Sequence, residues 1–214
     1  MSEIPLEYVH REPDGDADEA VFVLHGRGAD EQDLLPVTAQ LPGDRHVISF
    51  RAPDRLRGGY TWYQLDLSGG GLESSQPHSE EFRRSLDLVA ESVDAAVEQF
   101  GLDADNLGLL GFSQGAITSF SSVLESPERF AWVVGLHGYL AAEHEDTEPE
   151  GIEGKPIFVG AGKQDQIIPA HRSEAAAERL HELGADVRYE AFNTGHGIGQ
   201  GELGAVVEFV EEQQ

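Results

Sequence analysis

The stretch LLGFSQGAIT, residues 109–118, places a serine between two glycines at the end of an apolar run. Ser113 follows Gly111 by two residues and precedes Gly115 by two, which is the G-x-S-x-G spacing of a nucleophile elbow. In such an elbow a sharp strand-to-helix turn exposes the serine hydroxyl, and glycines let the strand and helix pack closely. A plain turn capped by a serine is the alternative, and the apolar and helix-like flanks favour the elbow.

A serine hydroxyl is a weak nucleophile, so it needs a base within hydrogen-bond reach and an acid that orients the base. Two later residues provide these groups in the order serine, acid, histidine that accompanies this elbow. Asp165 follows an apolar run and precedes Ile-Ile-Pro, and His196 lies between two glycines. We expect Asp165 to orient the imidazole and His196 to transfer the proton. Asp165 taken alone is equally well explained as a turn residue, whereas packing explains His196 poorly.

A third segment, LHGRGAD (residues 24–30), also follows an apolar run. An H-G-x-G turn exposes backbone N–H groups, and a tetrahedral intermediate needs two such donors. We expect the N–H groups of Arg27 and Gln114 to form this oxyanion hole, and we assign His25 to bracing the turn.

Apolar runs alternate with amphipathic ones along the chain, and this alternation predicts the elements that must position these residues. Strands are expected over residues 21–25, 46–50, 107–112, 132–136, 156–160 and 187–192, with an edge strand over 6–10. Helices are expected over residues 79–100, 114–124, 170–183 and 201–212. Short apolar strands separated by helices predict an α/β fold, a mostly parallel sheet with helices on both faces. We expect one domain over residues 1–214 without a large cap domain.

The long connection over residues 51–78 is rich in glycine, serine and aromatic residues. We expect it to wall the site, with Tyr60, Trp62 and Tyr63 forming an aromatic acyl pocket that binds substrate. Trp62 serves equally well, on the sequence alone, as an anchor that pins the loop to the core.

Together these segments resemble the phospholipase/carboxylesterase family of α/β-hydrolases, which includes the acyl-protein thioesterases. The matching stretches run in the family's order and are LHGRGADEQDLLP, GGYTWY, LLGFSQGA, GAGKQDQIIP and GHGI. The resemblance implies hydrolysis of carboxylic esters or thioesters through an acyl-enzyme, with Ser113, Asp165 and His196 as the triad and without metal or cofactor. It also allows a homodimer. Alternatives are a non-catalytic binding protein on the same scaffold and a hydrolase of amide or C–C bonds.

The chain departs from the family pattern at three places. Arg27 stands where an apolar residue, often leucine, is usual, so its guanidinium either favours a substrate with a carboxylate or phosphate or points to solvent. Trp62-Tyr63 occupies a Trp-Phe-Asp region and lacks the acid. His137-Gly138 replaces a common Ser-Gly pair. The resemblance therefore does not identify the substrate beyond a small-molecule ester or thioester.

The charge of the chain is extreme, with 40 acidic and 14 basic residues and a net charge of −26. Such a field repels nucleic acid and anionic membranes, and it destabilises a compact fold unless salt screens it. Since only Lys155 and Lys163 are lysines, we expect a halophilic protein that works in a salt-rich cytoplasm. Cysteine is absent, which excludes disulfides and thiolate metal sites. No segment has the pattern of a signal peptide or the length to span a membrane.

Overall fold

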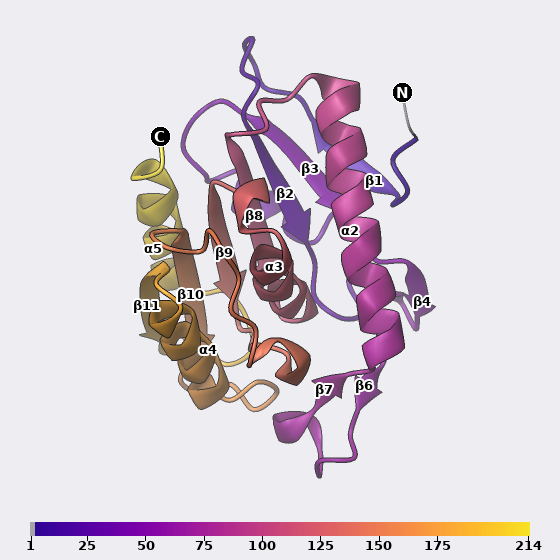
Figure 1. Ribbon diagram of the computed structural model, residues 1–214, viewed down its shortest axis with the longest axis vertical. Helices are drawn as coiled ribbons and strands as arrows, with labels where there is room; N and C mark the ends of the chain where they lie inside the picture. Colours follow the sequence, from indigo (N-terminus) through magenta and orange to yellow (C-terminus); the bar gives the residue numbers. More distant parts are fainter. Residues whose placement is uncertain (1–2) are drawn as a thin grey trace.

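The structure, a computed structural model, describes residues 3–214 and is built around one large β-sheet. Its strands are β1 (Tyr8–Arg11), β2 (Ala20–Leu24), β3 (His46–Phe50), β8 (Leu107–Phe112), β9 (Trp132–Leu136), β10 (Pro156–Gly162) and β11 (Asp186–Phe192). They are ordered β1-β3-β2-β8-β9-β10-β11 (Figure 1). Strand β1 pairs with β3 in antiparallel register, and all the other pairings are parallel.

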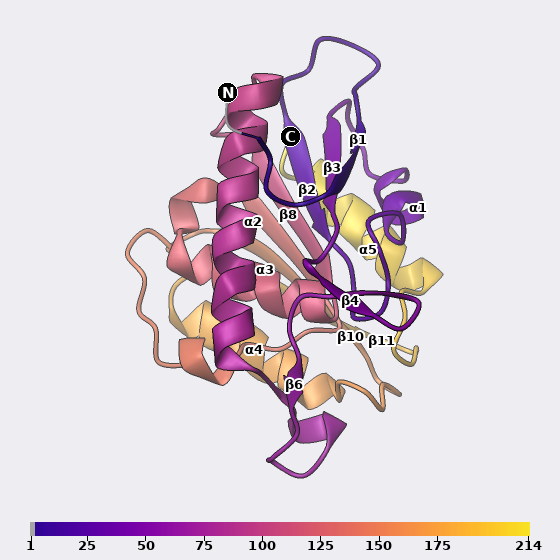
Figure 2. The same cartoon turned by 90° about the vertical axis from the view of Figure 1, so that its right-hand side faces the viewer.

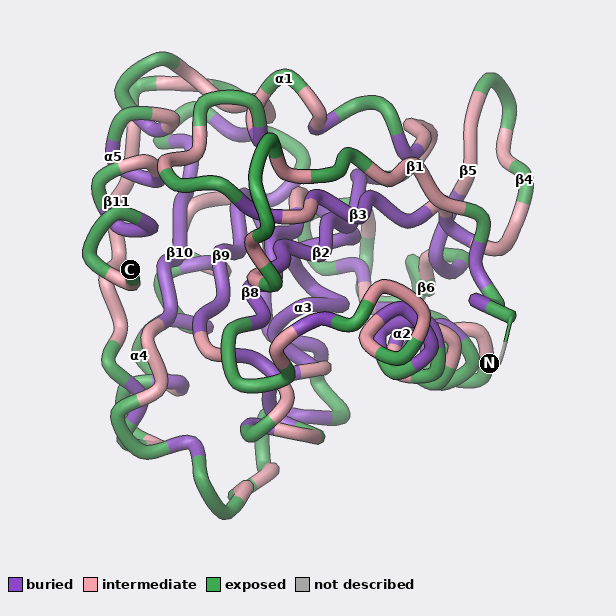
Figure 3. Tube along the Cα trace, turned by 90° about the horizontal axis from the view of Figure 1, so that it is seen from above, coloured by how far each residue is buried: buried purple, intermediate pink, exposed green. Residues whose placement is uncertain are grey.

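Helices cover both faces of this sheet (Figure 2). One face carries α2 (Ser79–Phe100), α3 (Gln114–Glu125) and α4 (Ala170–Glu182), and the other carries α1 (Leu35–Thr38) and α5 (Gln200–Glu211). Residues of β2 alternate between the two cores: Phe22 and Leu24 pack with α2 and α3, whereas Val21 and Val23 pack with α5. Because both faces of the strand are buried, the central strands read as continuous apolar runs, and Figure 3 shows them as the most buried part of the chain.

The predicted mostly parallel sheet and its helices are confirmed, with small shifts in their bounds. The edge strand β1 begins at Tyr8 and not at residue 6, and β10 extends to Gly162. The connection over residues 51–78 is more structured than predicted. It forms two short hairpins, β4 (Asp54–Leu56) with β5 (Gly59–Thr61) and β6 (Leu65–Asp66) with β7 (Gln76–Pro77). Strands of two or three residues are too short to leave an alternating pattern in the sequence.

Short 3₁₀ turns complete the chain, namely η1 (Leu72–Ser74), η2 (Pro127–Arg129) and η3 (Ala142–His144). Within residues 3–214, no helix has both the length and the apolar character that crossing a lipid bilayer requires.

The parallel arrangement determines where polar side chains gather. Strands β2, β8, β9, β10 and β11 all run in the same direction, so the loops that follow them lie along one edge of the sheet. In open parallel sheets this carboxyl edge is where ligands bind. Each candidate residue of the triad and oxyanion hole follows one of these strands.

Candidate active site

The turn between β8 and α3 holds Ser113 in a rare backbone conformation. Its φ is 56° and its ψ is −116°, and its N–H donates to the carbonyl of Leu136 at 2.8 Å. The two glycines of the motif are required by close backbone contacts. A Cβ on Gly111 would lie 2.3 Å from the carbonyl oxygen of Gly115, and a Cβ on Gly115 would lie 1.9 Å from that of Leu24. The G-x-S-x-G spacing is thus the spacing that this strand-to-helix packing permits.

Ser113, His196 and Asp165 form a continuous chain of hydrogen bonds. The Oγ of Ser113 lies 2.9 Å from Nε2 of His196, and Nδ1 of His196 lies 2.7 Å from Oδ2 of Asp165. The other carboxylate oxygen, Oδ1, accepts the N–H groups of Ile167 and Ile168 at 2.8 and 2.9 Å. These donors and the nearby imidazoles fix the carboxylate in one orientation, so His196 is held with Nε2 facing the serine.

Asp165 is 7% exposed, and two opposing effects act on its pKa. Burial raises the pKa, whereas hydrogen bonds from His137, from His196 and from the Ile167 and Ile168 backbone lower it. The hydrogen bonds prevail, and the pKa of Asp165 lies below its usual range. The carboxylate is therefore ionised at neutral pH, the state in which it can orient an imidazole.

Arg27 and Gln114 lie around Ser113, since all three line one cavity. Within residues 3–214 the N–H of Arg27 donates to no acceptor. Gln114 is the first residue of α3, and the first N–H groups of a helix lack intrahelical acceptors and carry its partial positive charge. The side chain of Gln114 is engaged elsewhere, since its amide bonds to the loop at Trp62 and Tyr63.

His25 is fully buried beneath the loop that carries Trp62. Its hydrogen bonds hold the turn at residues 24–30 in shape. Its Nδ1 donates to the carbonyl of Gly26 at 2.7 Å, and its Nε2 accepts the N–H of Ala52 at 3.1 Å. Burial lowers the pKa of His25 and outweighs the raising effects of Gly26 and the nearby acids. His25 is thus a neutral imidazole that braces the turn, the role its sequence position predicts.

A cavity of about 240 Å³ opens directly beside Ser113. Its lining is mostly apolar and consists of Arg27, Leu65, Leu72, Ser75, Ser113, Gln114, Ile117, Tyr139, Ile167, Ile168 and His196. Arg27 is exposed, and its guanidinium forms no ion pair with any part of the chain that the structure describes. The cavity thus joins an apolar wall to a free cation near the serine.

The three aromatic residues expected to bind substrate do not line this cavity. Trp62 and Tyr63 are fully buried: the indole N–H of Trp62 donates to the carbonyl of His25 at 2.8 Å, and Tyr63 packs edge-on against Phe82. Tyr60 lies beneath the guanidinium of Arg51. The geometry agrees with the alternative interpretation of Trp62 as a loop anchor. Sequence reasoning missed Tyr139 as a wall residue, because the only signal is its place three residues after β9.

The site contains one further polar residue that sequence reasoning did not use. His137 follows β9, and its Nδ1 lies 2.8 Å from the same Asp165 oxygen that binds His196. The ligand-type atoms of His137, Asp165 and His196 lie within 4.8 Å of one another, and they are hydrogen-bonded to each other instead of facing a common empty point. Their hydrogen bonds are directed at one another, so the three side chains form one hydrogen-bonded network.

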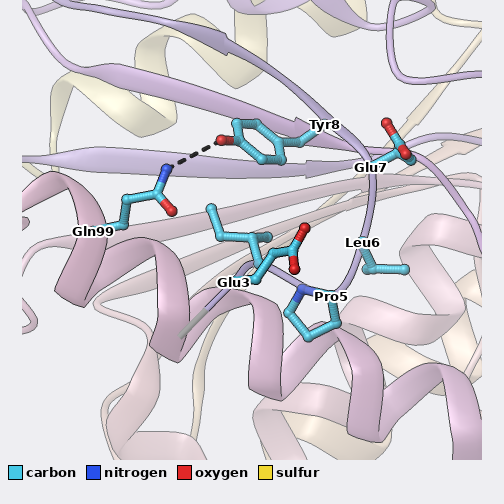
Figure 4. Close-up of a pocket in the computed structure, with 7 residues that line it drawn as sticks. Glu3, Pro5, Leu6, Glu7, Tyr8 and Gln99 are labelled. Carbon is cyan, nitrogen blue, oxygen red and sulfur yellow. Dashed lines mark hydrogen bonds between the residues drawn. The ribbon is translucent and has the colours of Figure 1, made fainter. Parts of the chain in front are cut away.

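A larger cavity of about 520 Å³ lies far from this chemistry, between the N-terminal segment and α2 (Figure 4). It is lined by residues 3–8 and Gln99, and the amide of Gln99 donates to the Tyr8 hydroxyl at 3.2 Å. No residue of the triad or the oxyanion hole contributes to it. The smaller cavity beside Ser113 is therefore the candidate substrate site.

The fold and the position of the serine define an α/β-hydrolase. A carboxylesterase of Bacillus cereus has the same fold, with a TM-score of 0.86 over 98% of this chain and 95% of that one at 22% identity. The chain belongs to the phospholipase/carboxylesterase family, whose model matches residues 8–214. It is 26% identical to the Bacillus subtilis protein MhqD over 92% of this chain and 95% of that protein. It is 25% identical to acyl-protein thioesterase 1 of Gibberella zeae over 84% of this chain and 76% of that protein. The chain is thus an ester-bond hydrolase.

Proposed function

We propose that the chain hydrolyses short- to medium-chain carboxylic esters or thioesters by a serine mechanism. Ser113 is the nucleophile, His196 the general base and Asp165 the residue that orients His196. The observation that carries this proposal is the unbroken series of contacts from Ser113 Oγ to His196 Nε2 at 2.9 Å and from His196 Nδ1 to Asp165 at 2.7 Å.

The proposed reaction has two halves. In the first, His196 Nε2 takes the hydroxyl proton while Ser113 Oγ attacks the substrate carbonyl carbon, and the imidazolium then protonates the departing alcohol or thiol. The negative charge on the carbonyl oxygen is stabilised by the N–H groups of Arg27 and Gln114. In the second half, His196 takes a proton from water as the water oxygen attacks the acyl carbon. The bond from that carbon to Ser113 Oγ then breaks, and the imidazolium returns the proton to Oγ as the carboxylic acid leaves. Asp165 stays ionised throughout, as its lowered pKa requires.

The cavity supports a limit on acyl length. Its volume of about 240 Å³ is below the roughly 300–1,000 Å³ typical of sites that enclose drug-sized ligands. Leu65 and Ile117 offer an apolar wall for a short or medium chain, and a long chain would extend into solvent. A thioester is retained as a substrate class because the similar protein of Gibberella zeae carries the name acyl-protein thioesterase 1.

We also propose the cellular location, partners and assembly of the enzyme. Residues 1–214 act as one domain in the cytoplasm, on a small-molecule substrate, alone or as a homodimer. The net charge of −26 supports the exclusion of nucleic acid as a partner.

A serine-directed fluorophosphonate probe tests the roles directly. We expect one covalent adduct on the native protein, located at Ser113 by peptide mass spectrometry and lost in Ser113→Ala. Ser74→Ala, an exposed serine of the neighbouring loop, is the matched control and should label like the wild type. A folded wild-type protein that stays unlabelled would instead favour the non-catalytic binding protein. Cleavage of a peptide-amide panel at rates above those of esters would favour the amide hydrolase.

A further inference from the structure

A second histidine binds the carboxylate that orients His196. His137 has a φ of 52°, and its N–H donates to the carbonyl of Gly160 at 2.8 Å. This backbone position directs the imidazole beneath Asp165, where Nδ1 lies 2.8 Å from Oδ2. The side chains of His137 and Asp165 are both 0% exposed. Oδ2 of Asp165 therefore lies between two imidazoles, one facing the serine and one facing the core.

Behind His137 lies a buried carboxylate on α5. Oε2 of Glu202 is 3.1 Å from Nε2 of His137, and the side chain of Glu202 is 0% exposed. Its other oxygen, Oε1, has no hydrogen-bond partner among residues 3–214. A Cβ on Gly160 would lie 2.4 Å from this oxygen, so the glycine in β10 leaves the space that the carboxylate occupies. A buried carboxylate is costly unless it is paired, and His137 is its partner.

The contacts require a proton between these two residues. Asp165 is ionised and accepts the Nδ1–H of His137, so Nε2 of His137 and Oε2 of Glu202 share one further proton. Burial lowers the pKa of His137, but the hydrogen bonds and charges of Glu202 and Asp165 outweigh burial and raise it. The remaining ionisable ring that faces His137 is His196, at 5.5 Å between centroids, and β8 contributes the uncharged ring of Phe112. The raised pKa of His137 favours the arrangement in which the proton stays on the imidazole and is donated to Glu202.

We propose that His137 and Glu202 are positioning residues of the hydrolytic site, which hold Asp165 in place and moderate its negative charge. The inference rests on the proposed function, because it assigns a role relative to the triad. The cation at His137 opposes the positive charge that His196 acquires during the reaction. The expected consequence of this repulsion is that the enzyme remains active to a lower pH than it would without the His137–Glu202 pair.

Glu202→Gln tests the charge while preserving the shape. The glutamine amide can donate to Nε2 of a neutral His137, which still donates its Nδ1–H to Asp165. A nearby charge typically moves a titration by about 1–3 pH units, and we expect the lower end because Glu202 partly offsets the cation. The acid midpoint of the kcat/KM profile should therefore rise by about one pH unit, with KM unchanged.

Glu125→Gln is the matched control. Oε1 of Glu125 lies 2.8 Å from Nε2 of the buried His144, at the end of α3 remote from Ser113. This variant removes the carboxylate from a second, part-buried histidine–glutamate pair, and it should leave the acid midpoint where the wild type has it.

The double variant His137→Asn/Glu202→Gln tests the positioning. Asparagine tolerates the positive φ of position 137, and the second change avoids a stranded carboxylate. Loss of the partner that orients a metal-bound histidine typically costs about ten- to a hundredfold. We expect a similar loss in kcat with KM unchanged, because neither side chain lines the cavity. A folded double variant with wild-type kcat would overturn the positioning role.

The ring nitrogens of His137 can also be observed in the wild type by ¹⁵N NMR, which needs no substrate and no variant. We expect both to carry protons at pH 7, and a neutral ring would overturn the inference. An unchanged acid midpoint in folded Glu202→Gln would overturn it as well. A wild type that neither hydrolyses esters nor reacts with the fluorophosphonate would refute the proposed function, and the NMR spectrum would still decide the state of His137.

Discussion

The side chain of Gln114 connects α3 to the loop that carries Trp62. Its Nε2 donates to the carbonyl of Tyr63 at 2.8 Å, and its Oε1 accepts the N–H of Trp62 at 3.2 Å. The hydroxyl of Thr61 also contacts Oε1, at 3.0 Å, but lies closer to the Tyr63 carbonyl, at 2.7 Å. In Gln114→Leu the Tyr63 carbonyl therefore keeps the Thr61 hydroxyl as a partner. The buried N–H of Trp62, in contrast, loses its acceptor.

A stranded buried donor costs about 1–3 kcal/mol and a lost hydrogen bond about 1 kcal/mol, so the free energy of unfolding should fall by about 3 kcal/mol. For a chain of this size each kcal/mol lowers Tm by about 2–4 °C, and we expect a decrease of about 6–12 °C. The backbone N–H of residue 114 is retained, so the variant should still react with the fluorophosphonate at temperatures where it is folded.

The assay is a thermal melt followed by circular dichroism in multimolar KCl. Gln99→Leu is the matched control, because its half-exposed amide makes a single bond to Tyr8 at 3.2 Å and its loss should cost less than about 1 kcal/mol. A Tm decrease in Gln114→Leu no larger than that in Gln99→Leu would refute the reasoning.

Further predictions concern charge. Because the net charge is −26, Tm should rise from low salt to multimolar KCl, and equal melting in both would contradict a halophilic protein. The pKa of Asp165 is lowered by folding, so its contribution to stability is complete above about pH 4 and is lost as pH falls through the folded pKa. Asp165→Asn should flatten the acid decline of the free energy of unfolding measured by urea titration. An unchanged decline would argue against this contribution of Asp165. Arg27→Leu should lower kcat/KM about tenfold for esters with a terminal carboxylate and leave neutral esters unchanged; an equal change for both would place the Arg27 side chain in solvent.

The elements and the turn at Ser113 were predictable because their signals are local. The apolar runs of β8 and β9 mark strands buried on both faces, and Gly111 and Gly115 mark a turn in which backbone atoms approach within 2.3 Å of any added Cβ. The position of His196 beside Ser113 was predictable because packing explains a histidine between two glycines poorly. These inferences needed only a few consecutive residues each.

The parts that sequence reasoning missed depend on contacts between distant residues. His137 stands 28 residues before Asp165 and 65 before Glu202, and nothing local to His137 indicates that all three meet. Trp62 and Tyr63 are residue types that often form binding surfaces, yet both point into the core. The indole N–H of Trp62 donates to the His25 carbonyl, and the ring of Tyr63 packs edge-on against Phe82. A short sequence pattern does not distinguish an aromatic wall from an aromatic anchor.

The most direct measurement of the central claim is hydrolysis of p-nitrophenyl esters from acetate to palmitate, in multimolar KCl, by the wild type and Ser113→Ala. We predict activity that is highest for short to medium chains, as the cavity of about 240 Å³ allows, and that is abolished in the variant. Activity that persists in folded Ser113→Ala, or that is greatest for palmitate, would contradict the account.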